Sequence, residues 1–323
     1  MTGVLVHQMP HPVHAAWARA AGLELHAWLP RAEPYATVWL RDLAAARRVP
    51  RTRLAVAEGG GPAGACVLAK TLGRVERAIL LAADETWARL RRGVPKPLPA
   101  TERAWWRLLA RGLDGAIAVS PYVADDLRAL HPGLRVEVVR PHIAPELQAR
   151  LLKLDPALDG QRLLHLASTA PKNGTTVLLE AFARVRKNSP GAELHVVGAG
   201  SEGLRAAGVV AHGRVPDLAA HLAAADLFVL PGLGQACPVA TLEAMAAGVP
   251  TLVSTETGTR DLVHPRLVAA PDAAALAVAI TDYLQLAPRE RADLAAGSRR
   301  AVEGLTQERQ CAAFRAALAR LAP

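Results

Sequence analysis

The sequence has few cysteines, few aromatic residues and no long hydrophobic run. Its three cysteines, Cys66, Cys237 and Cys311, include no pair at metal-binding spacing, so neither a structural zinc site nor a disulfide framework is expected. Aromatic residues make up 4% of the chain and do not alternate with basic runs, which argues against nucleic acid as a partner. The apolar runs fall far short of the roughly 20 residues that a membrane-spanning helix needs. The first residues lack the features of a signal peptide, so we expect a cytoplasmic protein.

Several motifs of phosphate and ester chemistry are also missing. There is no Gly-x-x-x-x-Gly-Lys-Ser/Thr phosphate loop and no Gly-x-Ser-x-Gly nucleophile motif. Gly198-Ala199-Gly200 lacks the third glycine and the downstream acid of a dinucleotide fingerprint. These absences exclude the common nucleotide-hydrolase, serine-hydrolase and dehydrogenase interpretations.

The charge is strongly positive, with 38 Lys and Arg residues against 29 Asp and Glu residues and a formal net charge of +9. This favours an anionic partner such as a phosphorylated ligand or an acidic lipid headgroup. Basic clusters lie at residues 41–53 and 89–111 in the first half. They are interpreted either as solvated helix faces or as a surface for peripheral contact with an anionic membrane.

Apolar strand-like runs alternate with helix-like segments along the whole chain. This pattern predicts an α/β protein with two doubly wound, Rossmann-like domains and a cleft between them. We expect the domains at residues 1–150 and 151–306, with a last helix at 307–323 that packs back on the first domain. Residues 84–87 are expected to be irregular, and a short helix is expected near residues 258–263.

The most informative stretch runs from residue 225 to residue 254. A buried strand is followed by a tight loop, a helix that ends at Gly248-Val249-Pro250, and another strand. The loop and the helix N-terminus then lie at the carboxyl edge of a parallel sheet, where free N–H groups attract phosphate. The sequence thus predicts a diphosphate site, whose candidate contacts are Ala236, Cys237, Pro238, Val239 and Thr241.

An ordered set of motifs in the second half resembles the two-domain (GT-B fold), metal-independent glycosyltransferases of family 4, the group 1 type. The set begins at Lys172-Asn173-Gly174 and continues through Val196 to Gly200, His212 to Val215 and Ala224 to Pro231. It ends with the loop and helix described above. The resemblance implies a nucleotide-binding second domain and an acceptor-binding first domain.

Two positions eight residues apart are acidic in this family. The second is Glu243, which the resemblance makes a ligand of the nucleotide ribose, since a carboxylate can accept hydrogen bonds from a vicinal diol. The first is Gln235 here, at a position implied to act on the transferred sugar. Its amide keeps the hydrogen bonds and loses the charge, which indicates either weakened chemistry or a different donor sugar.

The family's diphosphate clamp is also altered. An Arg and, five residues later, a Lys precede the glycine in relatives, whereas this chain has Ser168 and Asn173, with Lys172 displaced by one residue. Lys172 is interpreted either as a phosphate ligand or as an exposed loop lysine. Gly198 and Gly200 allow close approach of the backbone to a ligand or form simple turns. The other candidate nucleotide contacts are Gly213 and Arg214.

The first half carries fewer signals. Many relatives have a histidine after a central strand, where this chain has Asp84-Glu85. Asp84 is expected either to act on an acceptor hydroxyl or to cap a helix. His7, His11 and His14 are expected near the first strand, as possible ligand contacts.

The resemblance implies a retaining transfer of a sugar from a nucleoside diphosphate to a hydroxyl of a glycan, lipid or small molecule. No Asp-x-Asp triplet occurs, and no metal or cofactor is expected beyond the donor substrate. The alternative is a catalytically weak member that binds a nucleotide sugar or glycan as a partner subunit or scaffold. Gln235, Asn173 and Ser168 favour the alternative, and Glu243 opposes it.

Overall fold

The computed structural model describes residues 3–28, 37–168 and 170–323. Its contacts divide the chain into two compact units. The first comprises Met1–His142 with Gln307–Pro323, and the second comprises Ile143–Thr306. The first unit therefore ends at His142, and not at residue 150, because helix α7 (Pro145–Leu151) packs against α10 (Val239–Ala246) of the second unit. Helix α13 (Gln307–Leu321) packs on α1 (Pro12–Ala20).

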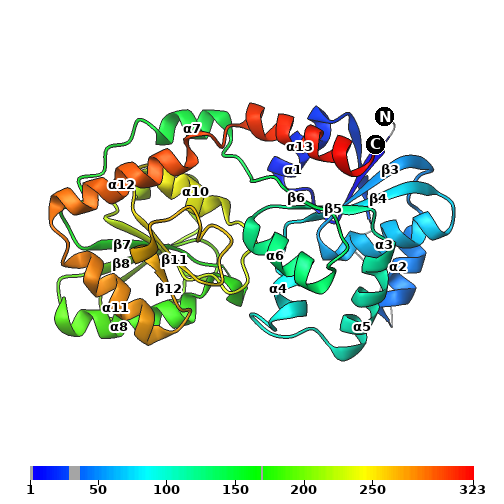
Figure 1. Ribbon diagram of the computed structural model, residues 1–323. Helices are drawn as coiled ribbons and strands as arrows, with labels where there is room; N and C mark the ends of the chain where they lie inside the picture. Colours follow the sequence, from blue (N-terminus) through cyan, green and yellow to red (C-terminus); the bar gives the residue numbers. More distant parts are fainter. Residues whose placement is uncertain (1–2, 29–36, 169) are drawn as a thin grey trace. The chain divides into compact units, whose positions relative to one another are not determined.

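The first unit is built on a parallel sheet of six strands in the order β2-β1-β3-β4-β5-β6 (Figure 1). The central strands are apolar runs buried on both faces, as expected when helices cover a parallel sheet on both sides. The strands are β1 (Gly3–His7), β2 (Leu23–Ala27), β3 (Thr52–Glu58), β4 (Val75–Ala82), β5 (Gly115–Ala118) and β6 (Val136–Val138).

Helices cover both faces of this sheet. Helices α1 and α13 lie on one face, where the rings of Trp17 and Phe314 stack with their centroids 5.3 Å apart. Helices α2 (Val38–Ala46), α3 (Gly60–Thr71) and α5 (Ala100–Leu109) lie on the other face (Figure 1). The remaining described helices of the unit are α4 (Thr86–Arg91), η1 (Ala110–Gly112) and α6 (Pro121–Leu130).

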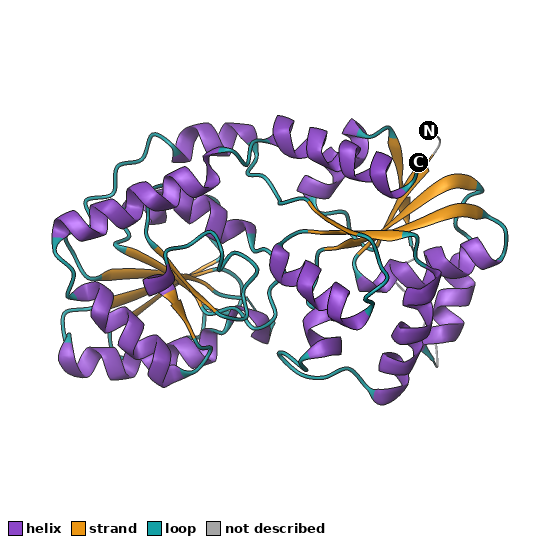
Figure 2. Cartoon of the chain, viewed as in Figure 1, coloured by secondary structure: helices purple, strands orange, loops and turns teal. Residues whose placement is uncertain are grey.

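The second unit has its own parallel sheet of six strands, in the order β12-β11-β10-β7-β8-β9. Figure 2 shows the strands of this sheet with helices around them. The chain leaves β7 toward β8 on one side and later returns to β10 on the other side. The strand order thus reverses between β7 and β10. The strands are β7 (Arg162–Leu166), β8 (Glu193–Val197), β9 (Val209–Gly213), β10 (Leu227–Leu230), β11 (Thr251–Ser254) and β12 (Val268–Ala269).

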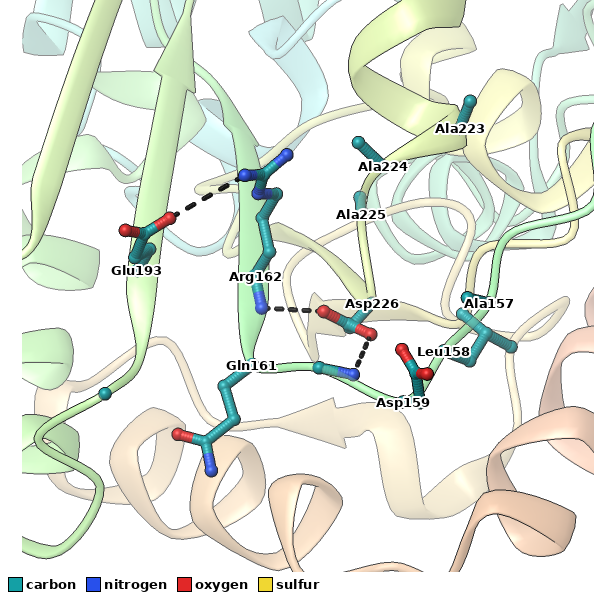
Figure 3. A pocket seen from close by; sticks show the side chains of 12 residues that line it. Ala157, Leu158, Asp159, Gln161, Arg162, Glu193, Ala223, Ala224, Ala225 and Asp226 are labelled. Carbon is teal, nitrogen blue, oxygen red and sulfur yellow. Dashed lines mark hydrogen bonds and ion pairs between the residues drawn. The ribbon is translucent and has the colours of Figure 1, made fainter.

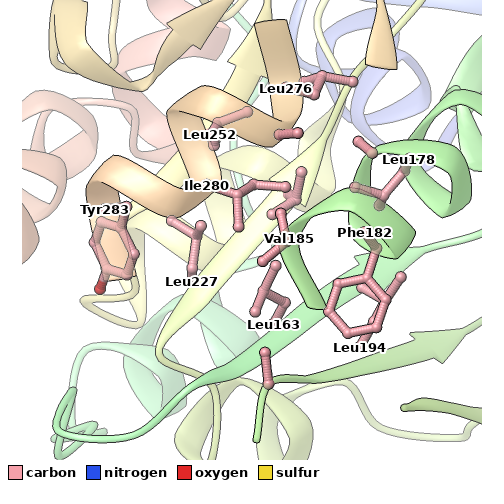
Figure 4. Packing of buried hydrophobic residues seen from close by; sticks show 14 of the residues in the cluster. Leu163, Leu178, Phe182, Val185, Leu194, Leu227, Leu252, Leu276, Ile280 and Tyr283 are labelled. Carbon is pink, nitrogen blue, oxygen red and sulfur yellow. The ribbon is translucent and has the colours of Figure 1, made fainter. Parts of the chain in front are cut away.

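The core of the second unit lies on both sides of this sheet. Phe182 of α8 (Thr175–Asn188) and Ile280 of α11 (Ala273–Leu284) pack over Leu163 and Leu227 of the central strands (Figure 4). The other face is covered by α7, α9, α10 and α12, with Met245 of α10 fully buried. The remaining helices are η2 (Pro171–Asn173), α9 (Ala219–Ala223), η3 (Pro265–Leu267) and α12 (Pro288–Glu303).

The α/β fold with two Rossmann-like units, predicted from the alternating pattern, is confirmed. Two local predictions differ from the structure. Residues 258–263 form turns instead of a helix. Residues 84 and 85 are irregular as predicted, but Thr86 and Trp87 already belong to helix α4.

Candidate functional site

The loops after β7 and β10 meet where the strand order of the second sheet reverses. In open parallel sheets this is the position at which ligands bind, beyond the carboxyl ends of the strands. The N–H of Leu233 donates to the carbonyl of Lys172 over 2.8 Å, so the two loops are joined by their backbones. Gly174, with a φ of 72°, brings the first loop against the carbonyl of Pro231. The structure thus places Lys172, Asn173 and Gln235 in one small region.

Asn173 and Gln235 are in direct contact. The Nε2 of Gln235 donates to the Oδ1 of Asn173 over 2.6 Å, and the Nδ2 of Asn173 donates to the carbonyl of Leu166 over 2.8 Å. The backbone of Gln235 is held by a bridge to Thr257. Ser168 lies just after β7, where its hydroxyl accepts a hydrogen bond from the N–H of Ala170. Two of the predicted site residues are therefore partners of each other.

The ends of β8 and β9 are also joined to each other. The N–H of Gly198 donates to the carbonyl of Gly213 over 2.6 Å, and the hydroxyl of Ser201 bonds to both glycines. The N–H of Gly200 donates to the carboxylate of Glu202. Gly198, Gly200 and Gly213 all have positive φ, so they serve the turn geometry of this edge. Arg214 follows Gly213 and is exposed.

The loop after β10 leads into α10 at Pro238, which precedes the first helical residue, Val239. Ala236 is buried, and Cys237 is partly exposed. Thr241 is fully buried, where its hydroxyl bonds to the carbonyl of Pro238 and to the hydroxyl of Thr259. Thr241 therefore holds the loop onto the helix. The N-terminus of α10 points to the carboxyl edge, where its dipole favours an anion.

Glu243 lies one turn further along α10, on the wall of a pocket of about 370 Å³. Burial raises the pKa of its carboxyl group. No residue that the structure describes donates a hydrogen bond to this carboxylate or pairs with its charge. A largely buried carboxylate without a partner is unfavourable in the empty protein, and it is suited to a ligand that donates hydrogen bonds.

The opposite wall of this pocket was missed from the sequence. It is formed by α7 and by the segment that leads into α9, and it includes an ion pair between Arg150 and Asp217. No helix is predicted from the sequence at residues 145–151. Pro145 at its first position and Glu146 in its first turn are the signals that would have predicted this helix.

A second pocket of the same unit, of about 340 Å³, lies at the opposite edge of the sheet (Figure 3). Its central carboxylate, Asp226, accepts hydrogen bonds from the N–H groups of Gly160 and Arg162 over 2.8 and 2.7 Å. Because both carboxylate oxygens bind the backbone, Asp226 fixes the start of β7. Asp226 therefore has a structural role in this pocket and needs no ligand as a partner.

Asp84 of the first unit serves as a helix cap. Its carboxylate accepts hydrogen bonds from the N–H of Gly60, at the start of α3, and from the N–H of Thr86, at the start of α4. Burial raises the pKa of the Asp84 carboxyl group. Asp84 lies in the first unit, apart from the predicted nucleotide contacts, which lie in the second. The sequence left two roles open for Asp84, action on an acceptor hydroxyl and capping of a helix. Its hydrogen bonds to Gly60 and Thr86 favour capping.

Polar groups gather at the carboxyl ends of β1 and β3, where the strand order of the first sheet reverses. The Nδ1 of His14 lies 2.5 Å from the Oε1 of Glu58, which also accepts a hydrogen bond from the N–H of His11. The Oε2 of Glu58 and the Nδ1 of His7 are buried without a partner among the described residues. Of the three histidines predicted near the first strand, His11 and His14 therefore contact Glu58.

Comparison with known proteins identifies the second unit. Residues 160–285 match the family model described as glycosyl transferases group 1. The second unit is therefore similar to the group 1 glycosyltransferases. The D-inositol 3-phosphate glycosyltransferase of Geodermatophilus obscurus is 32% identical over 269 residues, which cover 75% of this chain and 58% of that protein. The chain therefore spans less than two thirds of the length of this curated relative.

Solved structures share the two-domain fold of this chain. HepE of Anabaena, solved in complex with UDP and glucose, has a TM-score of 0.73 at 16% identity, with 99% of this chain and all of that chain covered. A sucrose-phosphate synthase of Thermosynechococcus elongatus has a TM-score of 0.74 at 16% identity, with 99% of each chain covered. The predicted resemblance to two-domain group 1 glycosyltransferases is confirmed.

Proposed function

We propose that this protein transfers a sugar from a nucleoside diphosphate donor to a hydroxyl acceptor. The observation that carries the proposal is Glu243, a largely buried carboxylate that has no partner among the described residues and lies on the helix after the β10 loop. Its two oxygens can accept hydrogen bonds from the two hydroxyls of a ribose. The relative named above is a glycosyltransferase, which supports a transferase and not a binding subunit.

The diphosphate is proposed to lie at the carboxyl edge of the second sheet. The N-terminus of α10 and the ammonium group of Lys172 are the positive groups offered to it there. These groups would stabilise the charge that develops on the leaving diphosphate, so that no metal ion is needed for this step. Gln235 is proposed to contact the transferred sugar.

The proposed reaction retains the configuration of the anomeric carbon. The bond from this carbon to the diphosphate oxygen breaks, and the acceptor oxygen forms its bond on the same face. The departing phosphate oxygen takes the proton of the acceptor hydroxyl, which balances the charge. The acceptor is proposed to bind the first unit near His14 and Glu58, whose carboxylate and ring nitrogens suit hydroxyl groups.

Donor-dependent turnover tests this function. The full chain is incubated with UDP-, GDP- and ADP-sugars, with and without EDTA, and the released nucleoside diphosphate is measured. We expect release from one donor, slow with water and faster with an added acceptor, at the same rate in EDTA. The product should be the α-anomer from an α-linked donor when analysed by NMR. No release from any donor contradicts the function, and loss of release in EDTA contradicts metal independence.

We further propose that the protein works in the cytoplasm and contacts an anionic membrane through one surface of the first unit. This α2–α5 surface consists of exposed side chains of α2, α5 and the residues that follow them: Trp39, Leu40, Arg47, Arg48, Arg107, Leu108 and Arg111. A hydrogen bond from the indole of Trp105 to Asp42 joins the two helices. Exposed apolar side chains beside arginines suit the lipid headgroup region. Among the described residues, no helix has the length and hydrophobicity to cross a membrane.

Vesicle flotation checks this contact. We expect the protein to float with phosphatidylcholine vesicles that contain phosphatidylglycerol, and not with phosphatidylcholine alone. Leu108→Glu should lower the bound fraction, because it places a negative charge between arginines. Changing Arg47 and Arg48 to Gln should weaken binding by about 1 kcal/mol for each residue. Val278→Glu alters an equally exposed apolar residue of the second unit and should bind as the parent does. Equal binding of all variants would contradict the α2–α5 surface.

A further inference from the structure

The amide groups of Asn173 and Gln235 form a chain of hydrogen bonds at the reversal of the second sheet. Asn173 closes the 3₁₀ turn η2 after β7, and Gln235 lies in the loop after β10. The chain runs from Gln235 to Asn173 over 2.6 Å and from Asn173 to the carbonyl of Leu166 over 2.8 Å. Asn173 is buried, whereas Gln235 is partly exposed. The inner amide is thus fixed, and the outer amide faces the ligand edge.

The backbone decides which way both amides point. The carbonyl of Leu166 can only accept, so the side of Asn173 that faces it must be the NH₂ group. The carbonyl oxygen of Asn173 then faces Gln235, which must present its own NH₂ group. The Oε1 of Gln235 is left as an acceptor. No residue in the described ranges donates a hydrogen bond to it.

We propose that Asn173 is a positioning residue that turns the amide of Gln235 so that its Oε1 accepts a hydrogen bond from a hydroxyl of the donor sugar. The inference rests on the proposed function, since it assigns the ligand of Gln235 as a sugar hydroxyl. Two neutral amides stand here at positions that are a lysine and an acid in the family pattern. The amide pair favours a donor sugar that has a hydroxyl at the position facing Oε1.

The geometry also couples the two positions. Gln235→Glu alone would set a carboxylate oxygen against the Oδ1 of Asn173, and two acceptors repel at 2.6 Å. Asn173→Lys alone would draw the Oε1 of Gln235 toward the ammonium group and away from the sugar, because nothing then holds the amide in its present orientation. The double variant gives the lysine two acceptors, the carboxylate and the carbonyl of Leu166. Asn173 and Gln235 both depart from the family pattern, and the two departures therefore depend on each other.

A double-mutant cycle tests the coupling. The parent, Gln235→Glu, Asn173→Lys and the double variant are compared in kcat and KM with UDP-glucose as the donor, and their melting temperatures confirm folding. We expect each single change to lower kcat/KM about tenfold or more, and the double variant to recover most of the loss. The loss should fall on kcat, because the amide acts on the sugar and not on the nucleotide. Additive losses would overturn the inference.

Fluorinated donors test the orientation of the amide. Monodeoxyfluoro analogues of UDP-glucose replace one hydroxyl donor at a time by an atom that cannot donate. The parent should bind one of them about tenfold more weakly than UDP-glucose, as expected for one hydrogen bond. In Asn173→Ala the amide of Gln235 is free to turn, so this discrimination should fall.

The controls separate this inference from the function on which it rests. Equal discrimination in the parent and in Asn173→Ala overturns the positioning role alone, because donor turnover remains. If the parent binds every fluorinated analogue as tightly as UDP-glucose, the assigned hydrogen bond from the sugar to Gln235 is overturned, and the proposed function is not. A parent that neither binds nor turns over any donor overturns the proposed function and the inference together.

Discussion

Glu243→Gln is expected to remove most of the stabilisation that the matching nucleoside diphosphate gives to the parent. A ligand at roughly 100 times its dissociation constant adds about 2.7 kcal/mol to the free energy of unfolding. The change replaces one acceptor oxygen by an NH₂ group and removes the charge. Each hydrogen bond to a charged acceptor contributes about 1.5–3 kcal/mol, so the affinity should fall at least about tenfold. Thermal unfolding with UDP, GDP and ADP measures the effect.

The matched control is Glu180→Gln, which changes an exposed glutamate on α8 of the same unit. It should respond to the nucleotide as the parent does. An unchanged response in Glu243→Gln would contradict the proposed ribose contact. A reduced response in both variants would assign the effect to the overall charge of the unit.

Without a ligand, Glu243→Gln should stabilise the fold, whereas with the nucleotide it should weaken the stabilisation by the ligand. Burial raises the pKa of Glu243, so the unfolded chain releases this proton at a lower pH than the folded chain does. The group therefore destabilises the fold progressively as pH rises from its ordinary pKa through the raised value. Without ligand, the variant should melt higher than the parent at neutral pH and equally in acid. A variant that melts lower at neutral pH would show that the carboxylate has a stabilising partner.

The fold could be predicted from the sequence because the apolar runs, the helix ends and the order of the elements all indicate the same architecture. Buried strands such as Leu227–Leu230 are short apolar runs, and the helix after them ends at Gly248, so the order of elements could be read directly. Helix α7 was missed because it is only seven residues long, too short to show a helical repeat of apolar residues. Its assignment to the second unit moved the boundary from residue 150 to His142.

The candidate site was predictable only in part. Glu243 and the loop before it are close in sequence, so local pattern was sufficient to place them together. The contact between Asn173 and Gln235 joins residues 62 positions apart, and only the parallel sheet brings them together. For Asp84, an acid at the start of a loop fits both catalysis and capping. Its hydrogen bonds to Gly60 and Thr86 are tertiary information that the sequence does not contain.

Gly174→Ala is expected to have the largest effect on stability, because two costs act at one residue. Gly174 has a φ of 72°, where a Cβ atom costs roughly 1–2 kcal/mol. A Cβ there would also collide with the backbone carbonyl of Pro231, which cannot rotate away. Overpacking adds roughly 1–3 kcal/mol, so we expect a loss of about 3 kcal/mol in urea unfolding.

The matched control, Gly73→Ala, isolates the first of these costs. Gly73 has a φ of 67°, but a Cβ there meets no atom within 4 Å. It should lose only about 1–2 kcal/mol. The difference between the two variants measures how tightly the loop after β7 is held against the loop after β10. Gly174→Ala should also weaken binding of the nucleotide sugar, since Asn173 is its neighbour in the chain, whereas Gly73→Ala should not. Equal losses of stability would show that the two loops are free to separate, and the amide pair would then have no rigid frame.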